Sequence, residues 1–343
     1  MPVDPIQLTR RLVDIESITY NEGAVGAFLA EFLSAQGYAV EKMAVEQHQE
    51  SRSTAERFNV YACAPGQTPE VVFSTHMDTV PPFLPSREDD EFIYGRGACD
   101  AKGIIAAQVA AAERLREQGL RVGLLFVSGE ERDSAGAKAA NLQPRGSRFL
   151  INGEPTDNRI ASASKGALRA VIRATGKMAH SAYPELGESA TQKLVEALHR
   201  ILAIPLPSLD DIGPSTLNIG VIGGGYAPNV IADHAEAQVM VRLVGPSDAI
   251  RRAIEQAVEG LATVDFTLEI PFRRLRSLPG LPTMVAAFTT DVPWLGNWGD
   301  PVLLGPGSIH VAHTPHEKLA KKELREAIDL YVAVAQRLVN EPR

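Results

Sequence analysis

Residues 71–80 read Val-Val-Phe-Ser-Thr-His-Met-Asp-Thr-Val, and this stretch decides how the chain is organised. An apolar, β-branched run that ends abruptly in polar residues predicts a buried strand whose last side chains reach the edge of a sheet. In open α/β sheets, ligands bind at the carboxyl ends of the strands. His76 at that edge, followed two residues later by Asp78, is typical of a metal ligand and the group that orients it.

Further carboxylates occur where the later strands of the first half are expected to end. They are Asp100, before a helix expected at about 104–118; the pair Glu130 and Glu131, after a strand at 122–128; and Glu154, after a strand at 149–151. Each has an ordinary structural interpretation, because the aspartate can cap the helix, the pair can be a solvated turn and the last glutamate can open a loop. Together, however, like charges at one sheet edge repel and are costly to bury without a cation.

The C-terminal part of the chain adds a histidine-containing loop. Residues 305–315 read Gly-Pro-Gly-Ser-Ile-His-Val-Ala-His-Thr-Pro and include His313. Histidine and carboxylate ligands together suit zinc or a similar divalent ion. The sequence therefore predicts a metal centre assembled from several strand ends.

The order of predicted elements divides the chain. Strand and helix alternate through residues 1–164, which predicts an α/β fold with a mainly parallel sheet flanked by helices. Residues 165–274 follow the order strand–helix–strand–strand–helix–strand of a ferredoxin-like α+β module. Residues 275–343 resume the strand-and-helix alternation of residues 1–164, with a strand at 302–304 and an amphipathic helix at about 317–339. We therefore expect a metal-binding domain in two parts, interrupted by an inserted domain.

Composition narrows the class of protein. The chain has 343 residues, is 45% hydrophobic and carries a formal charge of −8, as expected of a soluble globular protein with a large core. The mild acidity argues against nucleic acid or an anionic membrane as partner. Two cysteines, Cys63 and Cys99, form no disulfide framework, and with no signal peptide expected they favour the cytoplasm.

The motifs resemble those of the dinuclear zinc family that includes acetylornithine deacetylase, succinyl-diaminopimelate desuccinylase, aminoacylase and glutamate carboxypeptidase. The resemblance covers nearly the whole chain and implies a zinc-peptidase-like catalytic domain with two divalent ions, zinc, which cobalt can replace in vitro. It implies that Asp100 bridges the ions, that the first ion is bound by His76 and Glu154, and that the second is bound by Glu131 and His313. It further implies that Glu130 is the general base and that Asp78 orients His76.

The inserted domain carries a second part of the resemblance. Gly176-Lys177-Met178-Ala179-His180-Ser181 is similar to the family segment whose histidine reaches the active site across a homodimer and stabilises the oxyanion. Asn229, after a glycine run, and Arg242 match positions that bind the substrate's carboxylate end. Without the resemblance, His180 is better interpreted as part of a capped turn and the glycines as a tight bend. The resemblance implies that the inserted domain serves as lid and dimerisation domain.

The expected chemistry is hydrolysis of an amide bond in a small N-acyl amino acid. Two ions can hold a water between them, lower its pKa and polarise the carbonyl, while Glu130 takes the proton. Glutamate at 154 and the 305–317 segment are closest to acetylornithine deacetylase of arginine biosynthesis. Deacylases of N-acetyl-lysine, N-acetylcitrulline or N-succinyl-diaminopimelate, and a dipeptidase or carboxypeptidase, remain alternatives. A non-catalytic metal-containing binding protein is a further alternative, and a nucleotide-binding dehydrogenase fails because the glycine runs lack the strand–helix context.

Overall fold

The computed structural model describes residues 3–52, 54–66 and 68–342. The chain forms two compact units. The first contains the residues up to Ser162, Leu275–Met284 and the residues from Thr290 onward, and the second contains Ala163–Arg274 and Val285–Thr289. Within the described residues, no helix combines the length and the apolar character needed to cross a membrane.

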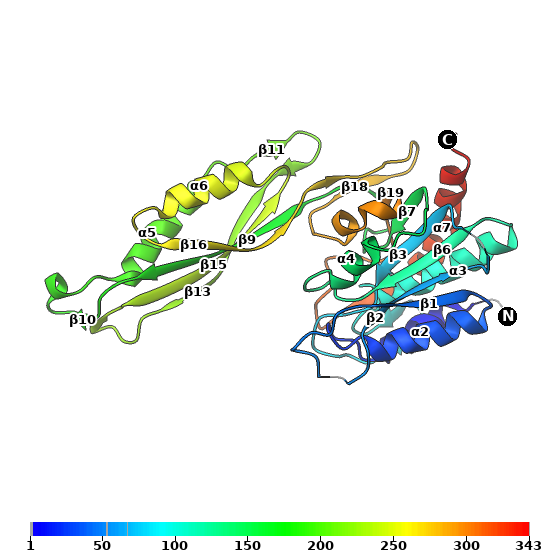
Figure 1. Ribbon diagram of the computed structural model, residues 1–343, viewed down its shortest axis with the longest axis horizontal. Helices are drawn as coiled ribbons and strands as arrows, with labels where there is room; N and C mark the ends of the chain where they lie inside the picture. The colour runs from blue at the N-terminus through cyan, green and yellow to red at the C-terminus, as the bar shows by residue number, and fades with distance from the viewer. Residues whose placement is uncertain (1–2, 53, 67, 343) are drawn as a thin grey trace. The chain divides into compact units, whose positions relative to one another are not determined.

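The first unit is built on a six-stranded sheet with strand order β1-β2-β6-β3-β7-β19 (Figure 1). Its strands are β1 (Ala39–Ala44), β2 (Phe58–Cys63), β3 (Val71–His76), β6 (Val122–Val127), β7 (Phe149–Asn152) and β19 (Asp300–Leu303). The four strands β6, β3, β7 and β19 run parallel to one another. At one side of them β2 pairs antiparallel with β6, and β1 pairs antiparallel with β2. The predicted α/β fold with a mainly parallel sheet is confirmed.

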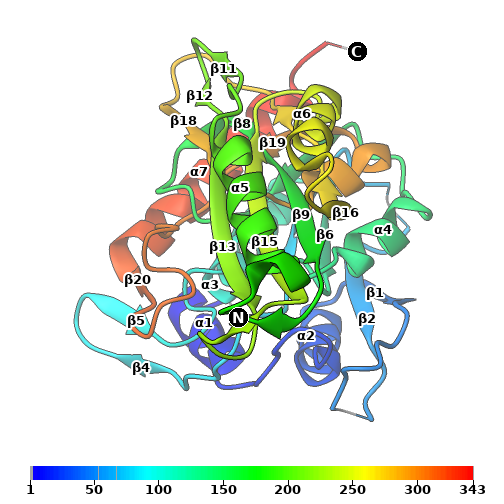
Figure 2. The same ribbon diagram turned by 90° about the vertical axis from the view of Figure 1, so that its left-hand side faces the viewer.

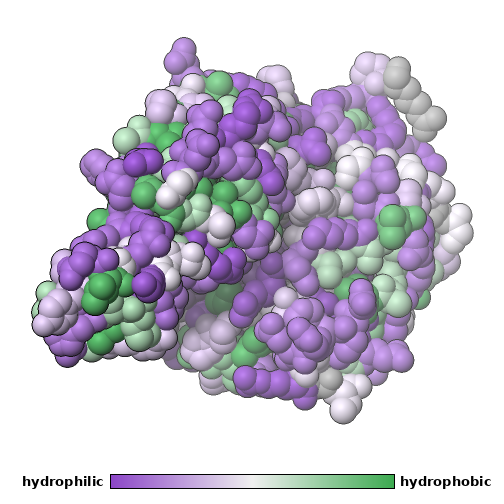
Figure 3. Space-filling view, turned by 60° about the vertical axis from the view of Figure 1, so that its left-hand side comes forward, coloured by the Kyte–Doolittle hydropathy of each residue, from purple (hydrophilic) through white to green (hydrophobic). Residues whose placement is uncertain are grey.

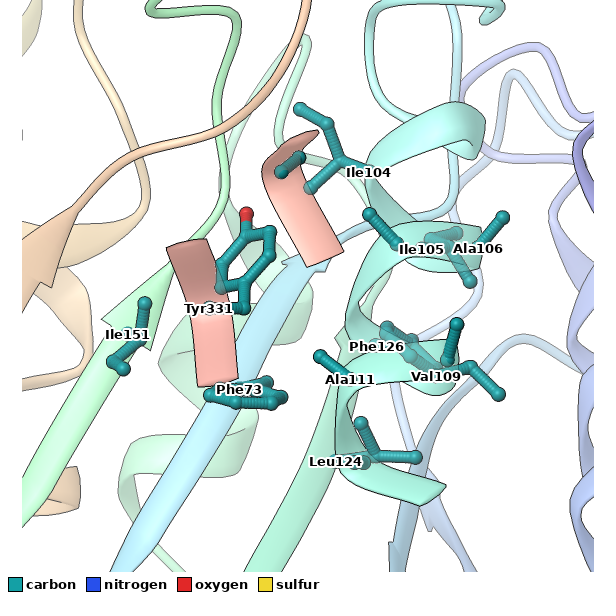
Figure 4. Close-up of a cluster of buried hydrophobic side chains, with 14 of the residues drawn as sticks. Phe73, Ile104, Ile105, Ala106, Val109, Ala111, Leu124, Phe126, Ile151 and Tyr331 are labelled. Atoms are coloured by element: carbon teal, nitrogen blue, oxygen red, sulfur yellow. The ribbon is translucent and has the colours of Figure 1, made fainter. Parts of the chain in front are cut away.

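Helices cover both faces of this sheet. They are α1 (Pro5–Val13), α2 (Gly23–Ala35), α3 (Lys102–Glu117), α4 (Ala135–Asn141) and α7 (Lys321–Val339), with short 3₁₀ turns η2 (Val292–Trp294) and η3 (Gly296–Trp298). The main core lies under α1, α2, α3 and α7, where Phe73 of β3 meets Tyr331 of α7 with 5.3 Å between ring centroids (Figure 4). The neighbouring Val72 points to the other face, into a smaller core with α4 and Trp298. Alternate residues of β3 therefore pack into the cores on the two faces of the sheet. This packing fixes the position of the strand end that carries His76.

Short strands complete the first unit and the link to the second. β4 (Arg87–Glu88), β5 (Phe92–Tyr94) and β20 (Lys318–Ala320) form one three-stranded sheet, and β8 (Ile160–Ser164), β17 (Arg273–Arg274) and β18 (Thr283–Ala286) form another. The helix predicted from about residue 317 begins only at Lys321, because residues 318–320 pair with β5 instead. The prediction of that helix start was wrong by about one turn.

The second unit is a four-stranded antiparallel sheet with two helices on one face. Its elements are β9 (Gly166–Thr175), α5 (Ala190–Leu202), β13 (Thr216–Gly224), β15 (His234–Leu243), α6 (Asp248–Val258) and β16 (Thr263–Ile270), in the strand order β13-β15-β9-β16. That order is the ferredoxin-like one. The helices α5 and α6 lie side by side over the sheet and share its apolar core (Figure 2). Small pieces complete the unit: β10 (Ala179–His180), η1 (Pro184–Leu186), β11 (Ser208–Leu209), β12 (Gly213–Pro214) and β14 (Val230–Ile231).

Candidate metal centre

His76 is fixed in one orientation at the carboxyl end of β3. Its Nδ1 lies 3.0 Å from the main-chain oxygen of Asp78, and its Nε2 lies 2.9 Å from Oδ1 of Asp100. A ring nitrogen that donates to a carbonyl leaves the other nitrogen free to act as a metal ligand. The ring is buried, so the imidazole has little freedom to turn away.

The Asp78 carboxylate faces His76 and also binds a neighbouring loop. Its Oδ1 lies 3.6 Å from His76 Nδ1, within ion-pair distance, and the main-chain oxygen of the same residue lies closer to that nitrogen. The carboxylate also accepts hydrogen bonds from the backbone N–H groups of Gly129, Glu130 and Glu131, at 2.9, 3.1 and 3.2 Å. It also accepts from the Thr19 hydroxyl at 2.9 Å. Asp78 therefore holds the loop that carries the two glutamates.

Five predicted ligands come together in two groups. One group is His76, Asp100 and Glu154, and the other is Asp100, Glu131 and His313, with ligand atoms in each group within 4.8 Å of one another. Nε2 of His313 lies 2.9 Å from Glu131 Oε1 and 3.2 Å from Asp100 Oδ2. Ligand atoms around one tetrahedral zinc ion lie roughly 3.4 Å apart, so these separations match a shared ion. Because Asp100 offers one oxygen to each histidine, it has the geometry of a bridging carboxylate.

The charges in the first unit favour divalent cations at this place. Burial raises the pKa of Glu154 well above its ordinary value, and it also raises the pKa of Glu131. Burial opposes ionisation of Asp100 as well, but His313 and His76 outweigh it and hold the pKa of this carboxyl low. Hydrogen bonds that His313 donates to Asp100 and Glu131 raise the pKa of this histidine to about 10. Two dications would compensate this excess of carboxylates, so the donor set fits the expected metals.

Glu130 lies next to the ligands but belongs to neither group. Burial, followed by the charge of Glu154, raises the pKa of Glu130 well above its ordinary value. Its backbone N–H is bound to Asp78 like that of Glu131, so the two adjacent side chains leave a fixed loop from successive positions. Neighbouring glutamates can therefore serve different purposes at one site.

Close packing explains the glycine before Glu154. A Cβ at Gly153 would lie 2.3 Å from Ile104 Cγ2 and 2.6 Å from Gln108 Nε2 of α3. The Gly153 backbone is bonded on both sides to β3, with its N–H donating to the Ser74 oxygen at 2.7 Å and its oxygen accepting from Thr75 at 2.8 Å. Only glycine lets the end of β7 approach α3 this closely, and this approach places Glu154 beside the end of β3.

The other three predicted site residues lie in the second unit. His180 is exposed on β10, where its Nδ1 accepts from the Ala182 N–H at 3.1 Å. Asn229 is beside it, since its main-chain oxygen accepts from the Ser181 N–H at 3.0 Å. Arg242 is paired with Ala167, at the opposite end of β9 from the strand β10. Within this unit the structure brings His180 and Asn229 together and leaves Arg242 roughly 25 Å away along the sheet.

Two buried acidic residues near the ligands were not assigned from the sequence. Asp291 is 1% exposed, and its charge contributes to the raised pKa values of Glu130 and Glu154. Glu317 is 2% exposed and bonds to the loop that ends at Asp100. Neither follows a predicted strand, so the rule that located the other carboxylates could not find them.

Known proteins place the chain in a family. The model of peptidase family M20/M25/M40 matches residues 72–337. A probable carboxypeptidase of Aspergillus flavus is 39% identical over 364 residues, which cover 94% of this chain and 84% of the relative. Among solved structures, a tripeptidase from Staphylococcus aureus has a TM-score of 0.81 at 21% identity, covering 99% of this chain and 100% of that chain. The Bacillus subtilis YXEP protein, described as a dinuclear metal-binding peptidase of the M20 family, has a TM-score of 0.65 at 18% identity, with 97% and 98% coverage.

The fold and the two ligand groups thus define a metal-dependent hydrolase that acts on amide bonds. The chain belongs to peptidase family M20/M25/M40.

Proposed function

We propose that the chain hydrolyses the amide bond of a small N-acyl amino acid, with two divalent ions held by His76, Asp100, Glu131, Glu154 and His313. The observation that carries this proposal is the pair of ligand groups that share Asp100, beside a half-buried glutamate that belongs to neither. We expect zinc in both places, with cobalt able to replace it in vitro, because imidazole and carboxylate ligands suit these ions.

Glu130 would act as the general base and then as the general acid. When bound, the two ions acidify a water and polarise the scissile carbonyl. Glu130 would accept the proton of the attacking water and pass it to the leaving amine. Glu130 is half-buried beside the ligand groups and belongs to neither, so its carboxylate can take part in this transfer. Asp78 supports the step by holding the backbone of Glu130.

The second unit would supply contacts to the substrate. We propose that His180 donates to the developing oxyanion and that Asn229 and Arg242 bind the carboxylate of the amino acid. His180 is exposed, its Nδ1 accepts from the Ala182 N–H and its ring lies edge-on to Tyr183, so its other ring nitrogen can face a ligand. The separation of Arg242 from the other two within the unit is consistent with their coming from different copies of the chain.

A homodimer formed through the second unit is part of this proposal. β13 is an edge strand whose outward residues Val221 and Ile222 are 53% and 62% exposed. On α5, Val195 and Leu202 are 66% and 62% exposed. Figure 3 shows apolar side chains among the polar ones on the surface of this unit. An unpaired edge strand beside exposed apolar residues is the kind of surface that a second copy can cover.

N2-acetylornithine is our first candidate substrate, which would make the chain a deacetylase of arginine biosynthesis. Glutamate at 154 and the segment around His313 support this choice through their resemblance to acetylornithine deacetylase. The relatives named as probable carboxypeptidases support a second candidate, removal of a C-terminal residue from a short peptide. Both candidates release an amino acid whose carboxylate lies beside the cleaved amide.

A substrate panel separates the candidates. Release of free amine would be measured with N2-acetylornithine, N-acetylcitrulline, N2-acetyl-lysine, N-succinyl-diaminopimelate, a dipeptide and a carbobenzoxy-dipeptide. The highest kcat/KM on acetylornithine would support the deacetylase. The highest value on a peptide would replace it with the carboxypeptidase, and turnover of none of them by protein with two bound ions would favour a binding protein.

A further inference from the structure

Glu317 has a buried carboxylate that accepts hydrogen bonds from the backbone of the loop leading to Asp100. Its Oε1 accepts from the N–H groups of Gly97, Cys99 and Asp100, at 2.9, 3.3 and 3.2 Å. Its Oε2 accepts from Arg96 Nη1 at 2.5 Å. The Glu317 side chain is fully buried and the Arg96 side chain nearly so, so this ion pair is shielded from water. A carboxylate that accepts three backbone N–H groups fixes the path of the chain that donates them.

The arrangement repeats what Asp78 does on another ligand loop. Asp78 accepts the three N–H groups of residues 129–131, which carry Glu131, and Glu317 accepts three N–H groups of residues 97–100, which carry Asp100. Each loop thus presents its metal ligand from a backbone tied to a buried anion. Outer partners of this kind decide how well a ligand is aimed at its metal.

Glu317 also joins that loop to the segment that carries His313. Its main-chain oxygen accepts from the Gly95 N–H at 3.2 Å, and Arg96 reaches the Thr314 oxygen at 3.3 Å. The following strand β20 pairs with β5, just before the loop. Residues 92–100 are therefore bound to Thr314, Glu317 and β20, although more than 200 positions separate the two segments in sequence.

We propose that Glu317 is a positioning residue for the second metal site, the one formed by Asp100, Glu131 and His313. It holds the loop of Asp100 and the segment of His313 in place beside each other. The inference rests on the ligands assigned under the proposed function. The ion bound by Asp100, Glu131 and His313 would depend on Glu317 more than the other ion does. His76 and Glu154 instead follow β3 and β7, neighbouring strands of the central sheet.

The test is a zinc titration of three proteins: wild type, Glu317→Gln and Glu22→Gln. Glu22 is a matched control, because its buried carboxylate is paired with buried Arg57 at 2.9 Å and, among the described residues, accepts from the Tyr20 N–H rather than from an N–H of a ligand loop. Each protein is stripped of metal and titrated with zinc against a competing chelator. Cobalt spectra then report the geometry at each site. Thermal unfolding of each metal-free variant measures the general cost of losing a buried carboxylate.

We expect Glu317→Gln to bind the second zinc about 10–100-fold more weakly and to lose less affinity for the first, which shares only Asp100 with the affected segments. Glu22→Gln should bind both as the wild type does, even if its melting temperature falls equally. Unchanged affinity for both ions in Glu317→Gln would refute the inference, as would equal weakening in both variants. If the wild type itself binds fewer than two ions, the proposed function fails as well, so the two failures are distinguishable.

A measurement on the wild type covers the case in which Glu317→Gln does not fold. Hydrogen exchange of the metal-free protein would be followed over residues 95–101. We expect slow exchange there without metal, because Glu317 and not the ions holds these N–H groups. Exchange as fast as in an exposed loop, with protection only after zinc is added, would overturn the inference.

Discussion

Replacing Glu130 by glutamine should stop turnover while leaving the metal content intact. Glutamine has the size of glutamate but cannot accept the proton of the attacking water. A general base contributes about 10²–10⁴-fold to a rate. We therefore expect kcat to fall by at least about 10²-fold, which corresponds to roughly 3 kcal/mol of lost transition-state stabilisation. Metal should remain because Glu130 belongs to neither ligand group.

The structure also fixes the sign of a stability effect. In the metal-free protein, burial and then the charge of Glu154 raise the pKa of Glu130 above its ordinary value. Ionising Glu130 in the folded, metal-free protein therefore lowers the free energy of unfolding. This loss of stability develops as pH rises from the ordinary glutamate pKa of about 4.3 through the raised pKa. Glutamine removes this cost. The metal-free Glu130→Gln variant should be more stable than the metal-free wild type at pH 8 and not at pH 4.

The assay pairs two neighbouring variants. Glu130→Gln and Glu131→Gln are compared for kcat with the best substrate and for zinc per chain. Glu131 lies 2.9 Å from His313, so its variant should lose one ion as well as turnover. Loss of zinc in Glu130→Gln equal to that in Glu131→Gln would show that Glu130 is a ligand. Full activity in Glu130→Gln would refute the assigned base.

Three further predictions concern the surroundings of the metals. Asp78→Ala should lower the free energy of unfolding by about 3–5 kcal/mol and weaken zinc binding, because it leaves one buried and two partly buried N–H groups of the 129–131 loop without their acceptor. Thr19→Val, which removes only the hydroxyl donor, should cost about 1 kcal/mol in thermal unfolding and keep both ions. His180→Ala should keep both ions and the dimer in sedimentation but lose about 10²–10³-fold in kcat, and an unchanged kcat would remove the histidine from the chemistry. Chelation should lower the melting temperature more at pH 8 than at pH 5.5. The raised pKa values of Glu131, Glu154 and His313 make the metal-free protein less stable as pH rises, and zinc displaces fewer protons from the ligands at pH 8. An equal shift at both pH values would contradict the charge balance described for the site.

The fold class could be predicted because its signals are local. The alternation of apolar strands and amphipathic helices is written in short windows, and the strands predicted at 122–128 and 149–151 match β6 and β7 to within one residue at each end. The start of α7 could not be predicted, because residues 318–320 are drawn into pairing with β5. That strand lies more than 200 residues away, so no local pattern reveals the competition.

Most of the candidate ligands follow from one rule, and the residues that hold them do not. His76, Glu131 and Glu154 come after parallel strands, whose carboxyl ends the sheet brings to one edge. Asp100 was expected at such a strand end, but the strand before it, β5, belongs to a separate antiparallel sheet, and Asp100 is placed by a loop. The Asp78 carboxylate contacts His76, and it also binds a loop some 50 residues later that no local pattern indicates. Glu317 and Asp291 also act on residues far away in sequence, so their roles depend on the assembled fold.

The most direct test of the central claim is turnover as a function of bound zinc. Wild-type protein would be stripped with a chelator and rebuilt with zero, one and two equivalents of zinc, and amine release from the best substrate of the panel would be followed at each stage. The account predicts no activity without metal and full activity with two ions per chain, with Glu130→Gln inactive at every stage. Amide hydrolysis that survives complete removal of metal would contradict it.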